Sequence, residues 1–260
     1  MLVLLSPSKT QDFQTDVDLP PGSEPTTPRM LEEAAQVMEA LRALPREELH
    51  RRLKLSPRLV GSVDAALDAW SGAGPGGAAE PAAFAYTGET YRGLAVRELD
   101  GPALRRVQQQ VRILSALYGV LRPLDAIEQY RLDCGVSLAV DGSRSLYEYW
   151  RGRITTRVAE DIRESGAGAV VNLASGEFAR AVDPGALGVE LVSPEFRQRD
   201  GGKLKNVTVF TKQARGSMAR WIACNSITTP DQLLHFQEAG YRYLPEESAP
   251  GSPVFVREAG

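Results

Sequence analysis

Short apolar runs alternate with amphipathic helices along this chain. Mainly apolar runs at residues 2–5, 113–117 and 169–173 are typical of strands buried on both faces. Apolar residues at helical spacing cover residues 102–112 and 145–164, which come shortly before the second and third runs. A helix that leads into an apolar strand favours parallel pairing, because parallel strands need a crossover connection. The pattern therefore predicts an α/β architecture.

The rest of the chain adds shorter strands and an antiparallel end. Strands are predicted at residues 82–86, 189–192 and 204–211. Residues 241–244 and 253–256 suit a closing antiparallel hairpin.

A glycine- and alanine-rich segment at residues 71–81 is predicted to be a surface loop. It is not interpreted as a domain linker, because the apolar segments before it are too few to form an independent core. The chain has 260 residues, a length that suits one large α/β domain. Residues 1–260 are therefore predicted to form a single domain.

Two short helices with a very short turn between them are predicted within residues 45–70. Ser56 caps the second helix, and Pro57 occupies its first position. This arrangement is similar to a helix-hairpin-helix module, in which hairpin amides and nearby cations hold a DNA phosphate without reading bases. Short helical hairpins are also common as packing units, so both interpretations stand. The basic residues around the turn are Arg51, Arg52, Lys54 and Arg58.

Polar side chains follow each of the three apolar runs. Strand ends of this kind commonly carry the functional groups of an α/β protein, because the strand is held in the core and the loop presents its side chains. A fourth polar edge, carrying Lys212 and Arg215, follows the strand predicted at residues 204–211. The candidate residues on the first three edges are Ser6, Ser8, Lys9, Tyr118, Arg122, Asp125, Tyr130, Arg131, Asn172, Ser175 and Glu177.

Two of these edges also have a purely structural interpretation. Arg122 and Asp125 flank Pro123 and can pair with each other to fix a tight turn. The Lys9 loop can be a solvated turn, although its amides and ammonium group also suit an anion. Both interpretations are kept here beside the functional ones.

Composition and charge restrict the classes of function. A net charge of -3 means that any nucleic-acid contact needs a local basic patch. The two cysteines, Cys134 and Cys224, and the two histidines, His50 and His235, lack metal-ligand spacing, so neither a metal nor a cofactor is predicted. The first apolar run is too short for a signal peptide or a membrane span, so a cytoplasmic protein without membrane contact is expected.

Four sequence strings together carry a resemblance to a known family. They are SPSKT at residues 6–10, LYGVLRPLD at 117–125 with YRLDCG at 130–135, NLASGEF at 172–178, and TKQARGSMARW at 211–221. In this order and at this spacing they resemble the YaaA family, the bacterial peroxide-stress proteins, over essentially the whole chain.

The resemblance implies a fold, a partner and a cellular role. The implied fold is a cantaloupe-like α/β (α+β) domain with a mixed central sheet and a helix-hairpin-helix element, which falls here on residues 45–70. The implied partner is double-stranded DNA, bound in a positively lined cleft with low sequence specificity. The implied role is in the hydrogen peroxide stress response, where the protein limits free iron and the oxidative damage that follows. The cleft residues implied here are Lys9, Arg122, Arg131, Lys212 and Arg215.

An enzyme or small-ligand protein is the alternative. Cationic and hydroxyl groups converging at strand ends also describe a pocket for an anionic small substrate, with Lys9 or Tyr118 as general acid or base. No catalytic constellation of nucleophile, base and orienting group is legible in the sequence. Direct iron binding would need Asp125, Asp133 and Glu177 to converge, and ion pairs with the neighbouring arginines explain these carboxylates more simply.

Overall fold

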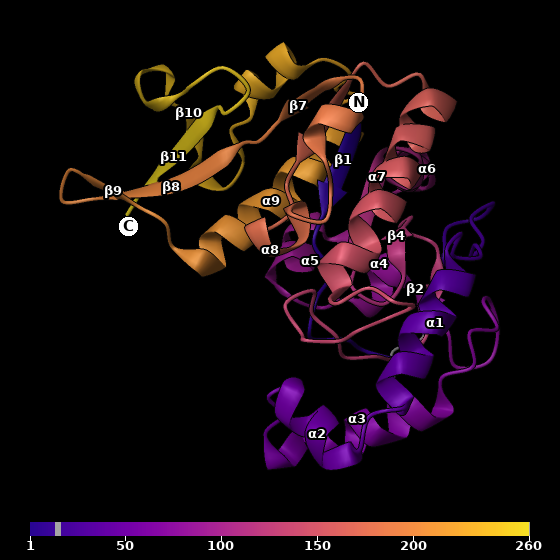
Figure 1. Cartoon of the computed structure of the whole chain (residues 1–260). Coiled ribbons are helices and arrows are strands. Elements are labelled where there is room, and N and C mark those ends of the chain that lie inside the picture. Colours follow the sequence, from indigo (N-terminus) through magenta and orange to yellow (C-terminus); the bar gives the residue numbers. More distant parts are fainter. Residues whose placement is uncertain (14–16, 260) are drawn as a thin grey trace.

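The fold is arranged around strand β1 (Leu2–Leu5), at the centre of a five-stranded sheet with the order β4-β3-β1-β6-β7. A computed structural model describes residues 1–13 and 17–259 (Figure 1). All four β1 side chains are buried, which requires cover on both faces of the sheet. β1 pairs in parallel with β3 (Val111–Ser115) and with β6 (Ala169–Asn172).

The outer strands make this sheet mixed. β7 (Glu190–Val192) pairs in parallel with β6, whereas β4 (Gly119–Leu121) returns antiparallel to β3 through a tight turn. Gly119 adopts a φ of 67°, a left-handed conformation that favours glycine. The predicted α/β domain with a mixed central sheet is confirmed.

A second sheet of four strands has the order β10-β11-β8-β9 and lies beside the first, at the upper left of Figure 1. Its aromatic side chains pack with those of neighbouring segments, and Phe196 contacts the rings of Phe236, Tyr241 and Phe255. The pairing of Arg242 with Val256 confirms the predicted antiparallel end. The strands are β8 (Glu195–Asp200), β9 (Lys203–Lys205), β10 (Arg242–Tyr243) and β11 (Val254–Glu258), and a separate pair consists of β2 (Glu80–Pro81) and β5 (Ala126–Ile127).

Two helices, α6 and α7, begin at a residue whose side chain caps the helix. Asp100 accepts a hydrogen bond from the amide of Ala103 (2.7 Å) at the start of α6, and Ser145 accepts one from the amide of Glu148 (3.2 Å) at the start of α7. The helices are α1 (Leu31–Arg42), α2 (Arg46–Arg52), α3 (Pro57–Ala69), α4 (Ala82–Ala85), α5 (Glu89–Leu94), α6 (Gly101–Gln110), α7 (Leu146–Ser165), α8 (Gly176–Ala179) and α9 (Thr208–Cys224).

Two predicted strands are helical instead. Residues 82–85 form α4, because four buried apolar residues fit either type of element and alanine favours the helix. The predicted strand at residues 204–211 ends at Lys205, and Thr208 already belongs to α9. The β-branched residues at 208–211 favour a strand locally, but the packing of α9 against α5 and β1 overrides that preference.

Helices α2 and α3 form the predicted helical hairpin. Lys54 takes a left-handed conformation in the turn, with a φ of 51°. His50 contacts a carboxylate oxygen of Asp64 (2.9 Å) across the hairpin, and Leu49 is buried in the core. The fold thus contains two helices joined by a short turn at this position, and their role as a DNA-binding module stays a prediction. No helix in the described part of the chain has the length and apolar content needed to cross a membrane.

Candidate functional site

A cavity of about 520 Å³ lies where the loops after β1 and β6 diverge. The next strand of this sheet after β1 is β3, which lies next to β1 towards one edge of the sheet. The next strand after β6 is β7, which lies towards the opposite edge. Adjacent parallel strands with opposite connections open a crevice at their carboxyl ends, which is the usual ligand position in such sheets. The cavity is completed by α5, by α9 and by residues 130–133.

Hydrogen bonds between the two loops stabilise the floor of the cavity. The hydroxyl of Ser6 donates to the hydroxyl of Ser175 (3.2 Å) and accepts from the Ser175 amide (2.8 Å). Tyr91, from α5, donates its hydroxyl to the Ser6 carbonyl (2.9 Å). Three segments far apart in the sequence are thereby held together beneath the cavity.

Five cationic side chains line this cavity: Lys9, Arg92, Arg131, Lys212 and Arg215. Lys9 forms an ion pair with Asp133 (2.6 Å). Within the described residues, Arg131, Lys212 and Arg215 form no ion pair with a carboxylate. The cavity therefore presents more positive charge than its own carboxylates neutralise locally.

Arg215 stands out because it is partly buried and forms no hydrogen bond or ion pair in the described part of the chain. Its Nε atom is inaccessible and has no hydrogen-bond partner in the part of the chain that the structure describes. Burial lowers the pKa of the Arg215 guanidinium, and no nearby carboxylate offsets this effect. A buried polar group in this condition indicates a place for an additional partner.

The position of Arg215 depends on a very close crossing of α5 and α9. A Cβ atom on Gly216 would lie 1.7 Å from the Thr90 carbonyl oxygen, and one on Gly93 would lie 2.1 Å from the Gln213 carbonyl oxygen. Only glycine allows two backbones to approach so closely. The two α9 cations that line the cavity, Lys212 and Arg215, therefore lie on a helix that packs directly against α5.

Carboxylates also line the cavity, and each has a local partner. Glu89 accepts hydrogen bonds from Arg92 (2.8 Å) and from the side chain of Gln213 (2.5 Å). Glu177 accepts a hydrogen bond from the Gly135 amide (3.2 Å). The described residues contain no group of three or more His, Cys, Asp or Glu side chains arranged to hold a metal ion.

Cys134 is buried next to these carboxylates. Burial raises the pKa of its thiol to about 12, and the charges of Glu177 and Asp133 add to the shift. Since the thiolate is the reactive form, Cys134 is an inert thiol at neutral pH.

The two cysteines are expected to differ in their rate of alkylation. Cys224 is exposed, whereas Cys134 is buried and fully protonated at pH 8. Brief treatment of the native protein with iodoacetamide should add one label, on Cys224, and treatment in guanidinium should add two. Peptide mass spectrometry gives the position of each label. Rapid native labelling of Cys134 would contradict this assignment.

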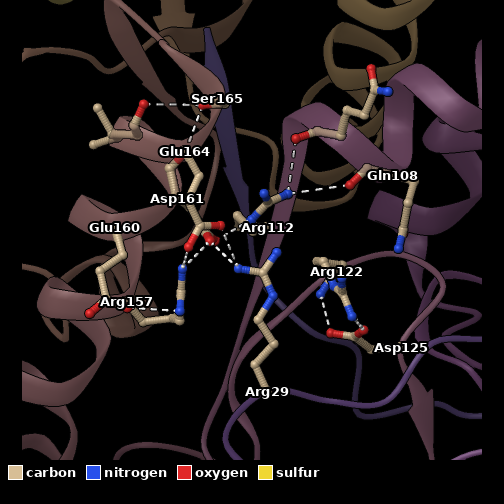
Figure 2. A network of polar contacts seen from close by, with 12 residues as sticks. Arg29, Gln108, Arg112, Arg122, Asp125, Arg157, Glu160, Asp161, Glu164 and Ser165 are labelled. Carbon is tan, nitrogen blue, oxygen red and sulfur yellow. Dashed lines mark hydrogen bonds and ion pairs between the residues drawn. The ribbon is translucent and has the colours of Figure 1, made fainter.

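Arg122 and Asp125 lie outside the cavity and pair with each other (Figure 2). The Asp125 carboxylate is fully buried and accepts hydrogen bonds from the Arg122 amide (2.7 Å), the Arg122 guanidinium (2.8 Å) and the Thr26 hydroxyl (2.6 Å). The structural interpretation, a tight turn around Pro123, is therefore confirmed. The structure does not bring Arg122 together with Lys9, Arg131, Lys212 and Arg215.

Two further candidates from the sequence also lie outside the cavity lining. Tyr118 is buried, and its hydroxyl accepts hydrogen bonds from the Trp70 indole (2.8 Å) and the Glu128 amide (3.0 Å). Burial raises the pKa of Tyr118 well above its usual value, which does not suit a general acid or base. Asn172 accepts a hydrogen bond from the Ala174 amide (3.1 Å). The polar candidates that do line the cavity are Ser6, Ser8, Tyr130, Ser175 and Glu177.

The cations of the α2–α3 hairpin lie outside the cavity. Arg51 and Arg52 pair with Glu48, and Arg52 also donates to the Ser137 carbonyl. That carbonyl belongs to the segment that continues from residues 130–133 of the cavity wall. The remaining two cations, Lys54 and Arg58, are exposed.

A buried charge network, which the sequence interpretation missed, surrounds Arg112 near the start of β3 (Figure 2). Asp161 on α7 is almost fully buried and pairs with Arg29 (2.5 Å), Arg112 and Arg157 (2.8 Å). The signal in the sequence was Arg112, a charged residue next to an apolar run. Such a residue needs a buried partner, which sequence alone did not identify.

Fold and site together define an α/β protein with a cationic cavity at the carboxyl edge of its central sheet. Over residues 1–247 the chain matches the family described as peroxide stress protein YaaA, and the chain belongs to this family. It is 37% identical over its full length to a UPF0246 protein of Shewanella halifaxensis, which it covers completely. It is also 38% identical over 259 residues to a UPF0246 protein of Shewanella pealeana, covering 99% of both chains. Its identity to a UPF0246 protein of Cereibacter sphaeroides is 40% over 259 residues, covering 100% of both chains. The resemblance seen in the sequence strings is confirmed.

Proposed function

We propose that this peroxide stress protein binds double-stranded DNA in the cytoplasm with little sequence preference. The supporting observation is the cavity lined by Arg131, Lys212 and Arg215, none of which has a carboxylate partner in the described residues. Cations of this kind attract phosphates, and phosphate contacts carry no sequence information. The net charge of -3 confines such binding to this local surface.

The α2–α3 hairpin extends the proposed DNA surface. Lys54 and Arg58 are exposed at its turn, and Arg52 links the hairpin to the segment that continues from the cavity wall. A duplex that crosses the cavity mouth and the hairpin turn would meet cations from both. This arrangement gives the hairpin the role of a helix-hairpin-helix element.

Binding to phosphates also offers a route to limiting iron-dependent damage. Duplex DNA collects cations along its phosphates, and a protein that neutralises phosphates releases them. Ferrous iron on DNA is such a cation, and its reaction with peroxide damages the strand that it occupies. We propose that the bound protein displaces iron from the DNA that it covers.

The expected result of a salt titration tests DNA binding. In the double variant Arg131→Met/Lys212→Met, the slope of log affinity against log salt should fall by about two, since each phosphate contact contributes about 0.9. Affinity should fall to a similar extent for unrelated duplex sequences. Fluorescence anisotropy with two duplexes at three salt concentrations provides the measurement.

The matched control is Arg163→Met/Arg242→Met, which removes the same charge from exposed positions outside the cavity and the hairpin. Equal losses in the two double variants would show that net charge, and not this surface, governs binding. A wild-type affinity that does not change with salt would exclude the proposal altogether.

A small-ligand protein or enzyme that acts on an anionic compound is the second candidate. The observation that favours it is the burial of Arg215 inside a concave site, since a partly buried cation contacts a small molecule more readily than a duplex. Lys9 is the remaining candidate for an acid or base in the cavity, and its ammonium is held by Asp133.

A further inference from the structure

Arg215 differs from the other buried arginines in having neither a carboxylate nor an aromatic ring beside it. Arg112 is more deeply buried but pairs with Asp161, and Arg157 pairs with three carboxylates. Arg257 also has an Nε without a hydrogen bond, but it stacks on Phe210 (4.3 Å to the ring centroid). For Arg215, no such compensation occurs among the described residues.

A buried cation without a partner destabilises the folded protein. Guanidinium loses hydration on burial, and the fold supplies no counter-charge at this point. A bound anion would supply both the charge and the missing acceptors. The geometry of guanidinium selects oxyanions such as phosphate and carboxylate, which accept two parallel hydrogen bonds.

The number of cations favours phosphate over carboxylate. Lys212 precedes Arg215 by one turn of α9, so both side chains lie on the same face of the helix. Arg131 joins them from the wall formed by residues 130–133. Three cations without carboxylate partners exceed what a single carboxylate neutralises, whereas a phosphate monoester carries a charge of about -1.5 to -2 near neutral pH.

The rest of the cavity suits a hydroxylated organic group. Hydroxyl groups of Ser8, Thr10 and Thr87 line it, together with the carboxylates of Asp133 and Glu177. These groups accept hydrogen bonds from sugar hydroxyls or amines. The volume of about 520 Å³ falls within the range of small-molecule sites, so the cavity has room for more than an inorganic ion.

We propose that the cavity binds a phosphate monoester of a sugar, with Arg215 and Lys212 on the phosphate and the sugar against the hydroxyl groups. Two sources carry this group, a terminal phosphate on a pentose: a nucleoside monophosphate and the 5′ end of a DNA strand. This inference rests on the second function proposed above and does not depend on duplex binding.

The test uses thermal shift and calorimetry with AMP, ribose 5-phosphate, adenosine and sodium sulfate. AMP and ribose 5-phosphate should raise the melting temperature in a saturable way, whereas adenosine and sulfate at equal concentration should not. A 5′-phosphorylated trinucleotide and its 5′-hydroxyl form distinguish a DNA end from a free nucleotide as the source. Equal shifts with adenosine and AMP, or with sulfate and AMP, would overturn the proposal.

The variant Arg215→Met tests whether Arg215 binds the ligand or only stabilises the fold. The variant should lose at least about tenfold in affinity for AMP, because a charge-assisted contact is removed. Its melting temperature without ligand should equal or exceed that of the wild type, because an uncompensated buried charge is gone. A lower melting temperature with unchanged AMP affinity would show that Arg215 is structural. Arg131→Met provides the same affinity test should Arg215→Met not fold.

The control Lys54→Met/Arg58→Met distinguishes this inference from the proposal for duplex DNA. These exposed hairpin cations lie outside the cavity, so AMP affinity should stay at the wild-type value. Duplex affinity should fall in the same variant if the hairpin contacts DNA. A chain that binds AMP but not duplex would support the cavity ligand alone, and the reverse result would overturn it.

Discussion

Replacing Gly216 with alanine is expected to lower the free energy of unfolding by about 3 kcal/mol or more. The added Cβ would lie 1.7 Å from the Thr90 carbonyl oxygen and 2.6 Å from the Leu94 amide nitrogen. Both atoms are backbone and cannot rotate away, so α5 and α9 would have to separate. Because this crossing forms one side of the cavity, phosphate binding should weaken together with stability.

Urea unfolding at neutral pH measures the effect. The control is Gly152→Ala, an exposed position inside α7 with no atom within 4 Å of an added Cβ. Alanine there should be neutral or stabilising by up to about 1 kcal/mol, because it is the better helix former. Gly93→Ala should resemble Gly216→Ala, since its Cβ would lie 2.1 Å from the Gln213 carbonyl oxygen. A Gly216→Ala protein as stable as the wild type would refute the close crossing.

Asp161→Asn is expected to cost about 3–5 kcal/mol of stability at neutral pH, since it leaves the buried Arg112 without its counter-charge. Burial pushes the pKa of Asp161 upward, but Arg112, Arg29 and Arg157 outweigh it and hold the pKa below the usual value. A carboxylate whose pKa is lower in the folded than in the unfolded state stabilises the protein at pH values above the unfolded-state pKa. This contribution is lost as the pH falls towards the folded-state pKa.

The difference between the wild type and Asp161→Asn should therefore shrink below about pH 4, where unfolded aspartate becomes protonated. Unfolding in urea at pH 7 and at acidic pH measures both values. Glu164→Gln serves as the control, because Glu164 contacts Arg29 and Arg157 from an exposed position (59%) and should contribute little. A pH-independent difference would contradict the charge network.

The apolar runs were sufficient to predict the three middle strands of the central sheet, whereas β4 (Gly119–Leu121) was expected to be part of a loop. Residues 2–5 and 169–173 have few alternatives to a buried strand, and the loops that follow them meet because parallel strands end at the same edge. Residues 208–211 show the limit of this reasoning. Their β-branched and aromatic composition favours a strand, and the packing of α9 against α5 and β1 makes the helix preferable.

The candidate site was predictable only in part, because partners decide the role of a cation. Arg122 and Arg215 look alike in the sequence, each in a polar stretch after an expected strand. Asp125 pairs with the first, and the described residues offer no carboxylate to the second. Helix α5 was not predicted, although its Tyr91 supports the cavity floor. Contacts between segments this far apart leave no periodic signal in the chain.

In our proposal, the cavity presents the uncompensated guanidinium of Arg215 to a phosphate. The most direct test follows the Nε–H nuclear magnetic resonance signal of Arg215, assigned by its loss in Arg215→Met, during titration with AMP. We expect a saturable shift of this signal for AMP and none for adenosine. A signal that stays in place up to millimolar AMP would contradict the claim.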